Sequence, residues 1–164
     1  MSDRVSYEVE RVVDGVEIRR YAPVVLATVR TARDNEAFRI LFRYISGHNR
    51  SRRGGAGLRI PMTAPVFSDA FSFSFAMPPG YSAATTPLPL DSRSEIEEVP
   101  ARRVAVLRFG GVAGAASVES KTAELLATLT SHGLRHAGSP FLMRYDPPFK
   151  PGFLRRNEVA VELP

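Results

Sequence analysis

Several residue types that carry common protein chemistry are missing or scarce in this 164-residue chain. It contains no cysteine, which excludes disulfides, thiolate metal ligands and cysteine nucleophiles. It contains no tryptophan, and only two of its 22 basic residues are lysines, Lys121 and Lys150. No apolar run approaches the roughly 20 residues of a membrane-spanning helix, and the N-terminal stretch lacks the apolar core of a signal peptide. We therefore expect a cytoplasmic protein without a membrane span.

The positive charge of the chain is almost entirely arginine. The net charge is +5 and the pI is about 10.1, which favours anionic partners. The alternative explanation, which we prefer for most of the excess, is a GC-rich genome, because such genomes favour arginine codons over lysine codons. The densest basic cluster comprises Arg50, Arg52, Arg53 and Arg59. Aromatic residues do not alternate with these arginines, as a stacking platform for bases would require. The sequence therefore argues against a nucleic-acid partner, and it does not fix an oligomeric state.

Apolar and polar residues alternate, as in half-buried strands, over several short stretches. Asp14-Gly15 is a strong hairpin signal between the first two of them. The predicted strands are 5–13, 16–21, 24–31, 71–77, 94–99, 103–109, 140–145 and 157–163. In the stretch 71–77 the alternation places Phe71, Phe73 and Phe75 on one buried face.

Two stretches have the apolar spacing of amphipathic helices. Residues 35–46 place Phe38, Leu41 and Ile45 on one face, with Asp34 as the expected N-cap. Residues 115–132 form the second predicted helix, with an inward face of Val118, Thr122, Leu125, Leu126 and Leu129. The loop 48–57 between the first helix and the next extended segment is rich in arginine and glycine.

The order of these elements, ββαββ, occurs twice, which indicates an internal duplication. We expect one domain over residues 1–164, with a pseudo-repeat of about 5–77 and 94–163. Each half has one apolar helix and a sheet that needs a cover. The predicted fold class is α+β: a mixed, largely antiparallel curved sheet or partial barrel with two helices on one face.

Three motifs give the chain a family resemblance that runs from Tyr7 to Val161. They are AFRILFRYISGHN followed by IPMTAPV, YEVE with VEIRRYAP near the start, and YDPPFKPGFLRRNEV near the end. In combination they resemble the SOUL haem-binding protein family. The resemblance implies a fold similar to the gyrase-inhibitor-like effector-binding domains, and haem or another porphyrin as ligand.

The resemblance also implies a tetrapyrrole cleft beside the first helix and the loop before the last strand. Carried over position by position, it assigns Phe38, Phe42, Ile45, Phe149, Phe153 and Arg155 to the ligand. Aromatic rings with an arginine suit a ligand that has a wide apolar face and two carboxylates. For Phe38 and Ile45 the alternative is an ordinary core position, whereas Phe42 lies off the main helical face.

Candidates for an axial iron ligand are weak. The segment EIRRY offers no histidine where one haem-binding relative is thought to use one. His48, just past the first helix, could reach a haem iron, but an exposed loop histidine is the better interpretation. Met62, beside Pro61, is a candidate soft ligand, although strand methionines usually fill cores. His132 and His136 do not share a helical face, so we reject a zinc site.

The sequence contains no nucleophile–base pattern, phosphate loop or dinucleotide fingerprint. We therefore predict a carrier or buffer for haem or another porphyrin, with no catalytic residue. The alternative is a small-molecule effector-binding or hydrolytic module that uses a groove between the two halves. For that alternative Glu158, in the motif RRNEV, is the candidate inward carboxylate; otherwise it forms a structural ion pair.

Overall fold

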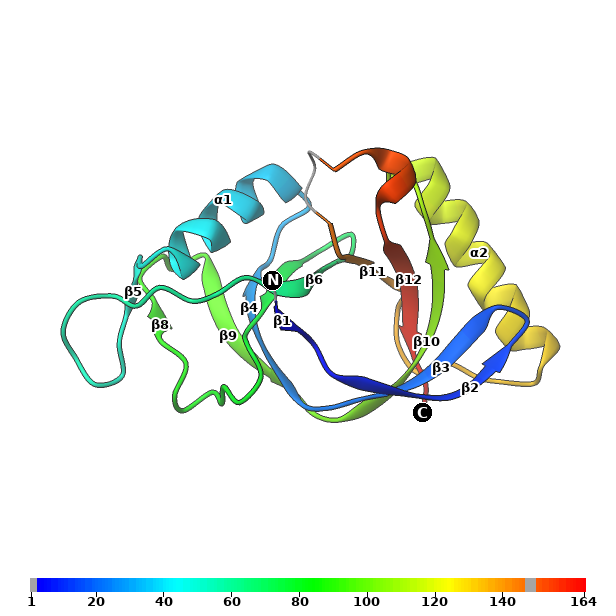
Figure 1. Ribbon diagram of the computed structural model, residues 1–164, viewed down its shortest axis with the longest axis horizontal. Helices are drawn as coiled ribbons and strands as arrows, with labels where there is room; N and C mark the ends of the chain where they lie inside the picture. The colour runs from blue at the N-terminus through cyan, green and yellow to red at the C-terminus, as the bar shows by residue number, and fades with distance from the viewer. Residues whose placement is uncertain (1–2, 147–149) are drawn as a thin grey trace. The chain divides into compact units, whose positions relative to one another are not determined.

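The computed structural model describes residues 3–146 and 150–164, and the chain divides into two compact units (Figure 1). The first unit comprises Met1–Val5 and Pro23–Pro100, and the second comprises Ser6–Ala22 and Ala101–Pro164. The hairpin of residues 7–21 thus belongs to the second unit, and the strand Ser94–Val99 belongs to the first. The predicted single domain and the repeat boundaries stay predictions.

The first unit is a five-stranded sheet with one helix and a short two-stranded ribbon. Its strand order is β1-β6-β7-β4-β9, antiparallel except for the parallel pair β1 and β6. The ribbon pairs β5 with β8. The elements are β1 (Asp3–Arg4), β4 (Val24–Val29), α1 (Asp34–Ile45), β5 (Asn49–Arg50), β6 (Thr63–Ser68), β7 (Phe73–Ala76), β8 (Leu88–Pro89) and β9 (Ser94–Val99).

Helix α1 packs against β4 and β7 through one apolar stripe (Figure 1). The stripe consists of Ala37, Ile40, Leu41, Tyr44 and Ile45, whose spacing is that of one helical face. Phe73, Phe75 and Met77 complete this core from the sheet. Each fully buried large side chain contributes about 1.5–3 kcal/mol, which fixes the helix on the sheet.

The second unit has an all-antiparallel sheet of order β2-β3-β10-β12-β11. Leu125 and Leu129 of the helix α2 are buried with Ile18, Ala105 and Val161 of the sheet. The elements are β2 (Tyr7–Val13), β3 (Val16–Tyr21), β10 (Arg102–Phe109), α2 (Ala115–Ser131), β11 (Phe141–Arg144), the 3-10 helix η1 (Gly152–Leu154) and β12 (Asn157–Glu162).

The predicted α+β class and the mixed, largely antiparallel pairing are confirmed. The hairpin prediction is also confirmed, because Asp14 and Gly15 have φ angles of 47° and 82°. Three details were wrong. Asp34 is the first helical residue, and Arg33 is the N-cap. Phe71 is 79% exposed, because it lies in the turn before β7, where its N–H donates to Asp69. Phe38 is exposed, as described next.

Candidate functional site

Two phenylalanines stand on the outer side of α1, away from its buried stripe. Phe38 is 38% exposed and Phe42 is 52% exposed. One helical turn separates them, and their rings stack with centroids 5.9 Å apart and an interplanar angle of 15°. Phe38 also meets the buried ring of Phe75 edge-on at 5.5 Å, so the pair is anchored to the core. The result is a fixed aromatic surface that faces solvent.

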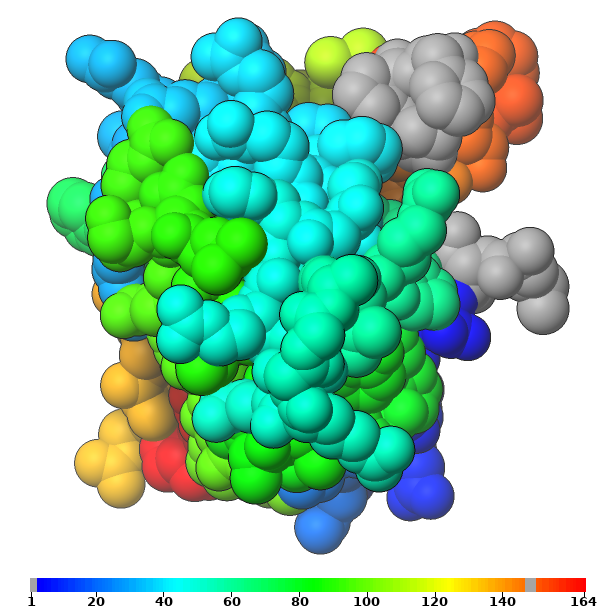
Figure 2. Space-filling model, turned by 90° about the vertical axis from the view of Figure 1, so that its left-hand side faces the viewer, coloured from blue at the N-terminus to red at the C-terminus, as the bar shows by residue number. Residues whose placement is uncertain are grey.

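Arginines surround this aromatic pair. An open hollow of about 710 Å³ is lined by Arg33, Glu36, Phe38, Arg39, Ile40, Phe42, Arg43 and Arg93. Figure 2 shows the outer side of α1 in cyan, with the green segment that follows β7 beside it. The lining residues carry four positive charges and one negative charge. A ligand with an apolar face and carboxylates would therefore meet suitable partners on one surface.

Asp91 and Glu36 hold one of these arginines in place. Arg93 Nη2 lies 2.7 Å from Asp91 Oδ2, and its Nη1 lies 3.3 Å from Glu36. Hydrogen bonds from the side chain and backbone of Arg93 lower the pKa of Asp91 to about 2. Arg43 lies 3.7 Å from the same carboxylate. Neither Arg43 nor Arg93 was singled out from the sequence, although the i, i+4 pair Arg39 and Arg43 runs parallel to Phe38 and Phe42.

The other predicted ligand residues have varied surroundings. Ile45 is 7% exposed and belongs to the core, and Met62 is half-buried against the same core. In the second unit, Phe153 is 84% exposed, and Arg155 Nε donates to the Lys150 carbonyl at 2.7 Å. Phe149 lies outside the described residues. His48 is exposed in the loop after α1. The assignment of these residues to a ligand stays a prediction.

The motif YISG-x-N fixes the backbone after α1. The Asn49 side chain donates to the Tyr44 and Leu58 carbonyls at 2.8 and 2.7 Å and accepts from the Leu58 N–H at 2.9 Å. The Tyr44 hydroxyl donates to the Pro87 carbonyl at 2.6 Å, and burial raises its pKa. At Gly57 an added Cβ would lie 1.9 Å from the Gly47 carbonyl oxygen, so only glycine fits. These residues hold the loop and leave the outer face of α1 free.

Glu158 is fully buried in the second unit and forms the ion pair that one interpretation of the sequence predicted. Arg19, itself 1% exposed, donates to both of its oxygens at 2.8 and 2.6 Å. Arg156 adds contacts of 3.0 and 3.2 Å to Oε2. Burial alone would raise the pKa of Glu158, but the hydrogen bonds and charge of Arg19 outweigh it and lower the pKa. Both oxygens are engaged, so a hydrolytic role finds no support.

Three tyrosines complete this buried network. The Tyr21 hydroxyl accepts from Arg19 at 2.8 Å, and the Tyr7 hydroxyl accepts from Arg156 at 3.0 Å. The Arg19 guanidinium lies 4.1 Å from the Tyr7 ring centroid, and that of Arg156 lies 4.1 Å from the Tyr145 ring centroid. Burial raises the pKa values of Tyr21 and Tyr145, so both stay protonated donors. Arg19 was missed from the sequence, although it shares one face of its strand with Glu17 and Tyr21.

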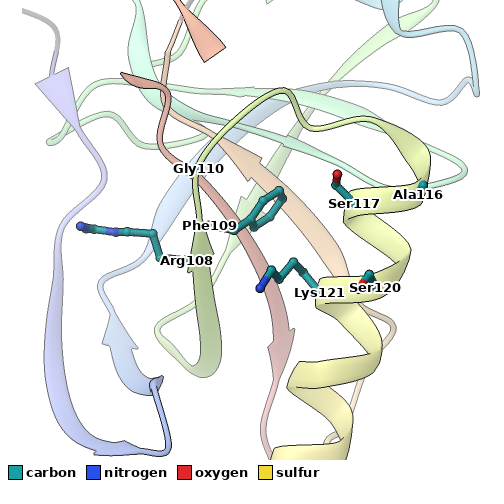
Figure 3. A pocket seen from close by; sticks show the side chains of 7 residues that line it. All are labelled: Arg108, Phe109, Gly110, Ala116, Ser117, Ser120 and Lys121. Atoms are coloured by element: carbon teal, nitrogen blue, oxygen red, sulfur yellow. The ribbon is translucent and has the colours of Figure 1, made fainter. Parts of the chain in front are cut away.

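A second hollow, of about 510 Å³, lies at the start of α2 (Figure 3). Ser117, Ser120 and Lys121 of the helix and Phe109 of β10 line it. Its lysine is already engaged, because Lys121 Nζ lies 3.1 Å from Glu124. Phe109 is only 8% exposed, so the hollow offers no aromatic surface comparable with that of α1. It suits a tetrapyrrole less well.

Within residues 3–146 and 150–164, no group of three or more histidine, aspartate or glutamate side chains is arranged to hold a metal ion. The residues that line the α1 hollow include no histidine, methionine or tyrosine. Among the helices described, none is long and apolar enough to cross a membrane.

Solved structures similar to this chain share its fold. The crystal structure of the EcmrR C-terminal domain matches with a TM-score of 0.60 and 9% identity, over 96% of this chain and 98% of that one. A cryo-EM structure of an EcmrR–DNA complex matches with a TM-score of 0.63 and 11% identity, over 91% of this chain. This chain spans 57% of that EcmrR chain. At such identity the likeness shows the fold alone.

Sequence comparison gives the family. No curated protein matches the chain. The family model described as SOUL heme-binding protein matches residues 2–162, which is nearly the whole sequence. The chain therefore belongs to the SOUL heme-binding protein family.

Proposed function

We propose that this protein binds haem or a related tetrapyrrole reversibly on the outer face of α1, as a carrier or buffer and not as a catalyst. The observation that carries the proposal is the stacked, solvent-facing pair of Phe38 and Phe42 beside arginines. Membership of a heme-binding family supports the ligand class.

The aromatic pair suits the apolar face of the ligand. Phe42 exposes half of its side chain, and Phe38 is held by Phe75, so the surface needs little ordering when a flat ring covers it. Burial of apolar surface contributes about 25 cal/mol per Å², before the cost of association is subtracted. The contact between ring and ligand is thus the main favourable contribution at this site.

Arginines suit the carboxylates of the ligand. Arg39 is exposed on the same side of α1, and Arg43 and Arg93 line the same hollow. A guanidinium group pairs with a carboxylate through two parallel hydrogen bonds when geometry permits. Phe153 and Arg155, which the family resemblance assigns to the ligand, belong to the second unit, and this proposal does not use them.

The hollow offers contacts for the porphyrin ring and its carboxylates but, among the described residues that line it, no side chain suited to ligate the iron. None of its lining side chains is a usual axial ligand, and His48 stands in the loop beyond the end of α1. We therefore expect a weakly ligated haem that exchanges readily, which suits a carrier. Iron-free protoporphyrin IX should bind nearly as tightly as hemin, because the apolar and ionic contacts are the same.

The test is titration of the apoprotein with hemin and with protoporphyrin IX, followed by the Soret band. Saturation at about one ligand per chain is expected. Phe42→Ala should weaken binding roughly five- to tenfold, since half a phenylalanine side chain is lost. Phe71→Ala is the control, because Phe71 is 79% exposed, more than Phe42 at 52%, but lies outside the hollow. Arg39→Gln should weaken binding and reduce its salt dependence.

Two results would contradict the proposal. One is a linear, non-saturating response equal to that of an unrelated basic protein. The other is a sharp low-spin spectrum that His48→Ala abolishes and Phe42→Ala leaves intact, which would make His48 the ligand and place the haem elsewhere.

A further inference from the structure

Three exposed apolar side chains lie on two adjoining loops of the second unit. Val112 is 64% exposed, Phe153 is 84% exposed and Leu154 is 54% exposed. Val112 lies in the loop between β10 and α2, and the other two lie in η1. The loops adjoin, because the Gly111 N–H donates to the Gly152 carbonyl at 2.9 Å, and a Cβ at Gly152 would lie 3.2 Å from Val112 Cγ2. We name Val112, Phe153 and Leu154 the apolar tip.

Hydrogen bonds hold the apolar tip in place. The Leu154 N–H donates to the Pro151 carbonyl at 2.9 Å, and the Arg155 N–H donates to the Gly152 carbonyl at 3.0 Å. Asn157, only 3% exposed, donates to the Gly111 carbonyl at 2.7 Å and so ties the Val112 loop to the start of β12. The backbone is fixed while the side chains stand in water. A single exposed apolar side chain is ordinary, but several on adjoining loops make a candidate interaction surface.

The chain around the tip is basic. From Arg144 to Arg156 the sequence has four positive residues and one negative residue, Asp146, a net charge of +3. Asp146 is paired with Lys150 at 2.8 Å. The nearby Glu158 is fully buried and neutralised by Arg19 and Arg156. These pairs engage positive and negative groups alike, but the positive groups outnumber the negative ones, so an approaching surface meets a net positive charge.

The size of the tip decides between partners. A stable protein–protein interface buries about 1,200–2,000 Å², which three side chains cannot supply. A bilayer accepts a small apolar insertion, and anionic headgroups add attraction for each nearby basic residue. Apolar side chains together with basic neighbours are the usual composition of a segment that binds at a membrane surface.

We propose that the apolar tip docks this protein on bilayers that contain anionic lipids, with Phe153 and Leu154 inserted at the level of the headgroups. The inference does not rest on haem binding, and its tests use protein without haem. It concerns peripheral attachment only.

The absence of tryptophan allows a direct test. Phe153→Trp introduces a single indole at the tip, and Phe71→Trp introduces one at an equally exposed position in the first unit. Each variant is mixed with vesicles of phosphatidylcholine alone or of an equimolar mixture with phosphatidylserine. We expect the emission of Phe153→Trp to shift to shorter wavelength with the anionic vesicles only, and that of Phe71→Trp to stay unchanged. The shift should diminish as salt is added.

Sedimentation with the same vesicles supplies the loss-of-function test. The double variant Phe153→Ser and Leu154→Ser should bind anionic vesicles roughly tenfold or more weakly than the wild type, because most of the inserted apolar area is lost. Both positions are exposed, so the melting temperature should not change. Equal binding by wild type and double variant, or an equal emission shift at position 71, would overturn the proposal. So would a dimer in light scattering that the double variant loses, since a second copy would then cover the tip.

Discussion

Replacement of Arg19 by methionine is expected to destabilise the second unit strongly. Arg19 and Glu158 are 1% and 0% exposed, and two hydrogen bonds of 2.8 and 2.6 Å join them. Methionine fills much of the space of the arginine side chain but carries no charge, so the buried Glu158 carboxylate loses its closest positive partner. Loss of one partner of a buried ion pair typically costs about 3–5 kcal/mol. Arg156 still contacts Oε2, so the expected loss is near the lower end, about 3 kcal/mol.

For a chain of this size that loss lowers the melting temperature by about 6–12 °C. Denaturation by urea, followed by circular dichroism at pH 7, measures the free energy directly. Arg20→Met is the matched control, because Arg20 is the next residue of β3, is 64% exposed and pairs with Glu10 at 3.2 Å. An exposed pair contributes about 0.2–1 kcal/mol, so the control should differ little from the wild type.

The pH dependence supplies an independent check. The pKa of Glu158 is lowered in the folded protein, so the pair stabilises the fold above the unfolded value of about 4.3 and is lost as pH falls through the folded pKa. In the Arg19→Met variant, Glu158 stays buried without this partner, which raises its pKa. As the pH falls, Glu158 becomes protonated, and the free-energy cost of burying its charge disappears. The difference in stability between wild type and variant should therefore shrink between pH 7 and pH 4. A loss below about 1 kcal/mol at pH 7, or one equal to that of Arg20→Met, would refute the reasoning.

Two further predictions concern the first unit. Gly57→Ala should lower the free energy of unfolding by about 3 kcal/mol or more, because the new Cβ would lie 1.9 and 2.9 Å from the backbone oxygens of Gly47 and Asn49. The control is Gly138→Ala, whose nearest contact is at 3.9 Å and which should be nearly neutral in the same urea denaturation. Asp91→Asn should cost about 1 kcal/mol at pH 7, since solvent around the half-exposed Arg93 screens the pair. With a folded pKa of about 2, that stabilisation is present above about pH 4 and disappears as pH falls to 2; a constant difference over this range would contradict the assignment.

The sequence predicted the elements well because their signals are local. Leu41 and Ile45 of the buried stripe and the turn Asp14-Gly15 depend on spacing and backbone preference alone. Phe38 was wrongly placed on the buried face because it lies at the edge of that face. Whether an edge position is covered depends on the strand beneath it, which spacing does not specify. Phe71 fits the alternation of the following strand in the sequence. In the structure it lies in the turn that Asp69 stabilises, before β7 begins.

The site was harder to predict because its charges come from distant parts of the chain. Arg93 reaches the α1 hollow across 57 residues from Glu36, and Arg19 reaches Glu158 across 139 residues. An arginine in an alternating strand pattern usually indicates the solvent-facing side. Arg19 is buried instead, because Glu158 and Tyr21 accept hydrogen bonds from its guanidinium group. The Arg19–Glu158 ion pair thus joins the motifs VEIRRY and RRNEV, which are far apart in the sequence.

The residues that fix α1 and the loop after it differ from Phe38, Arg39 and Phe42, which we propose contact the ligand, and this makes the binding experiments interpretable. Tyr44, Asn49 and Gly57 fix the backbone from inside, and none of them lines the α1 hollow. Phe42 lines it and is 52% exposed, so its removal forfeits little of the core. Phe75→Ala, by contrast, removes a ring that is 1% exposed and should cost about 3–5 kcal/mol. A loss of hemin affinity in Phe42→Ala at an unchanged melting temperature would therefore report on the ligand surface itself. The same loss accompanied by a fall in stability like that of Phe75→Ala would mean that Phe42 acts through the fold.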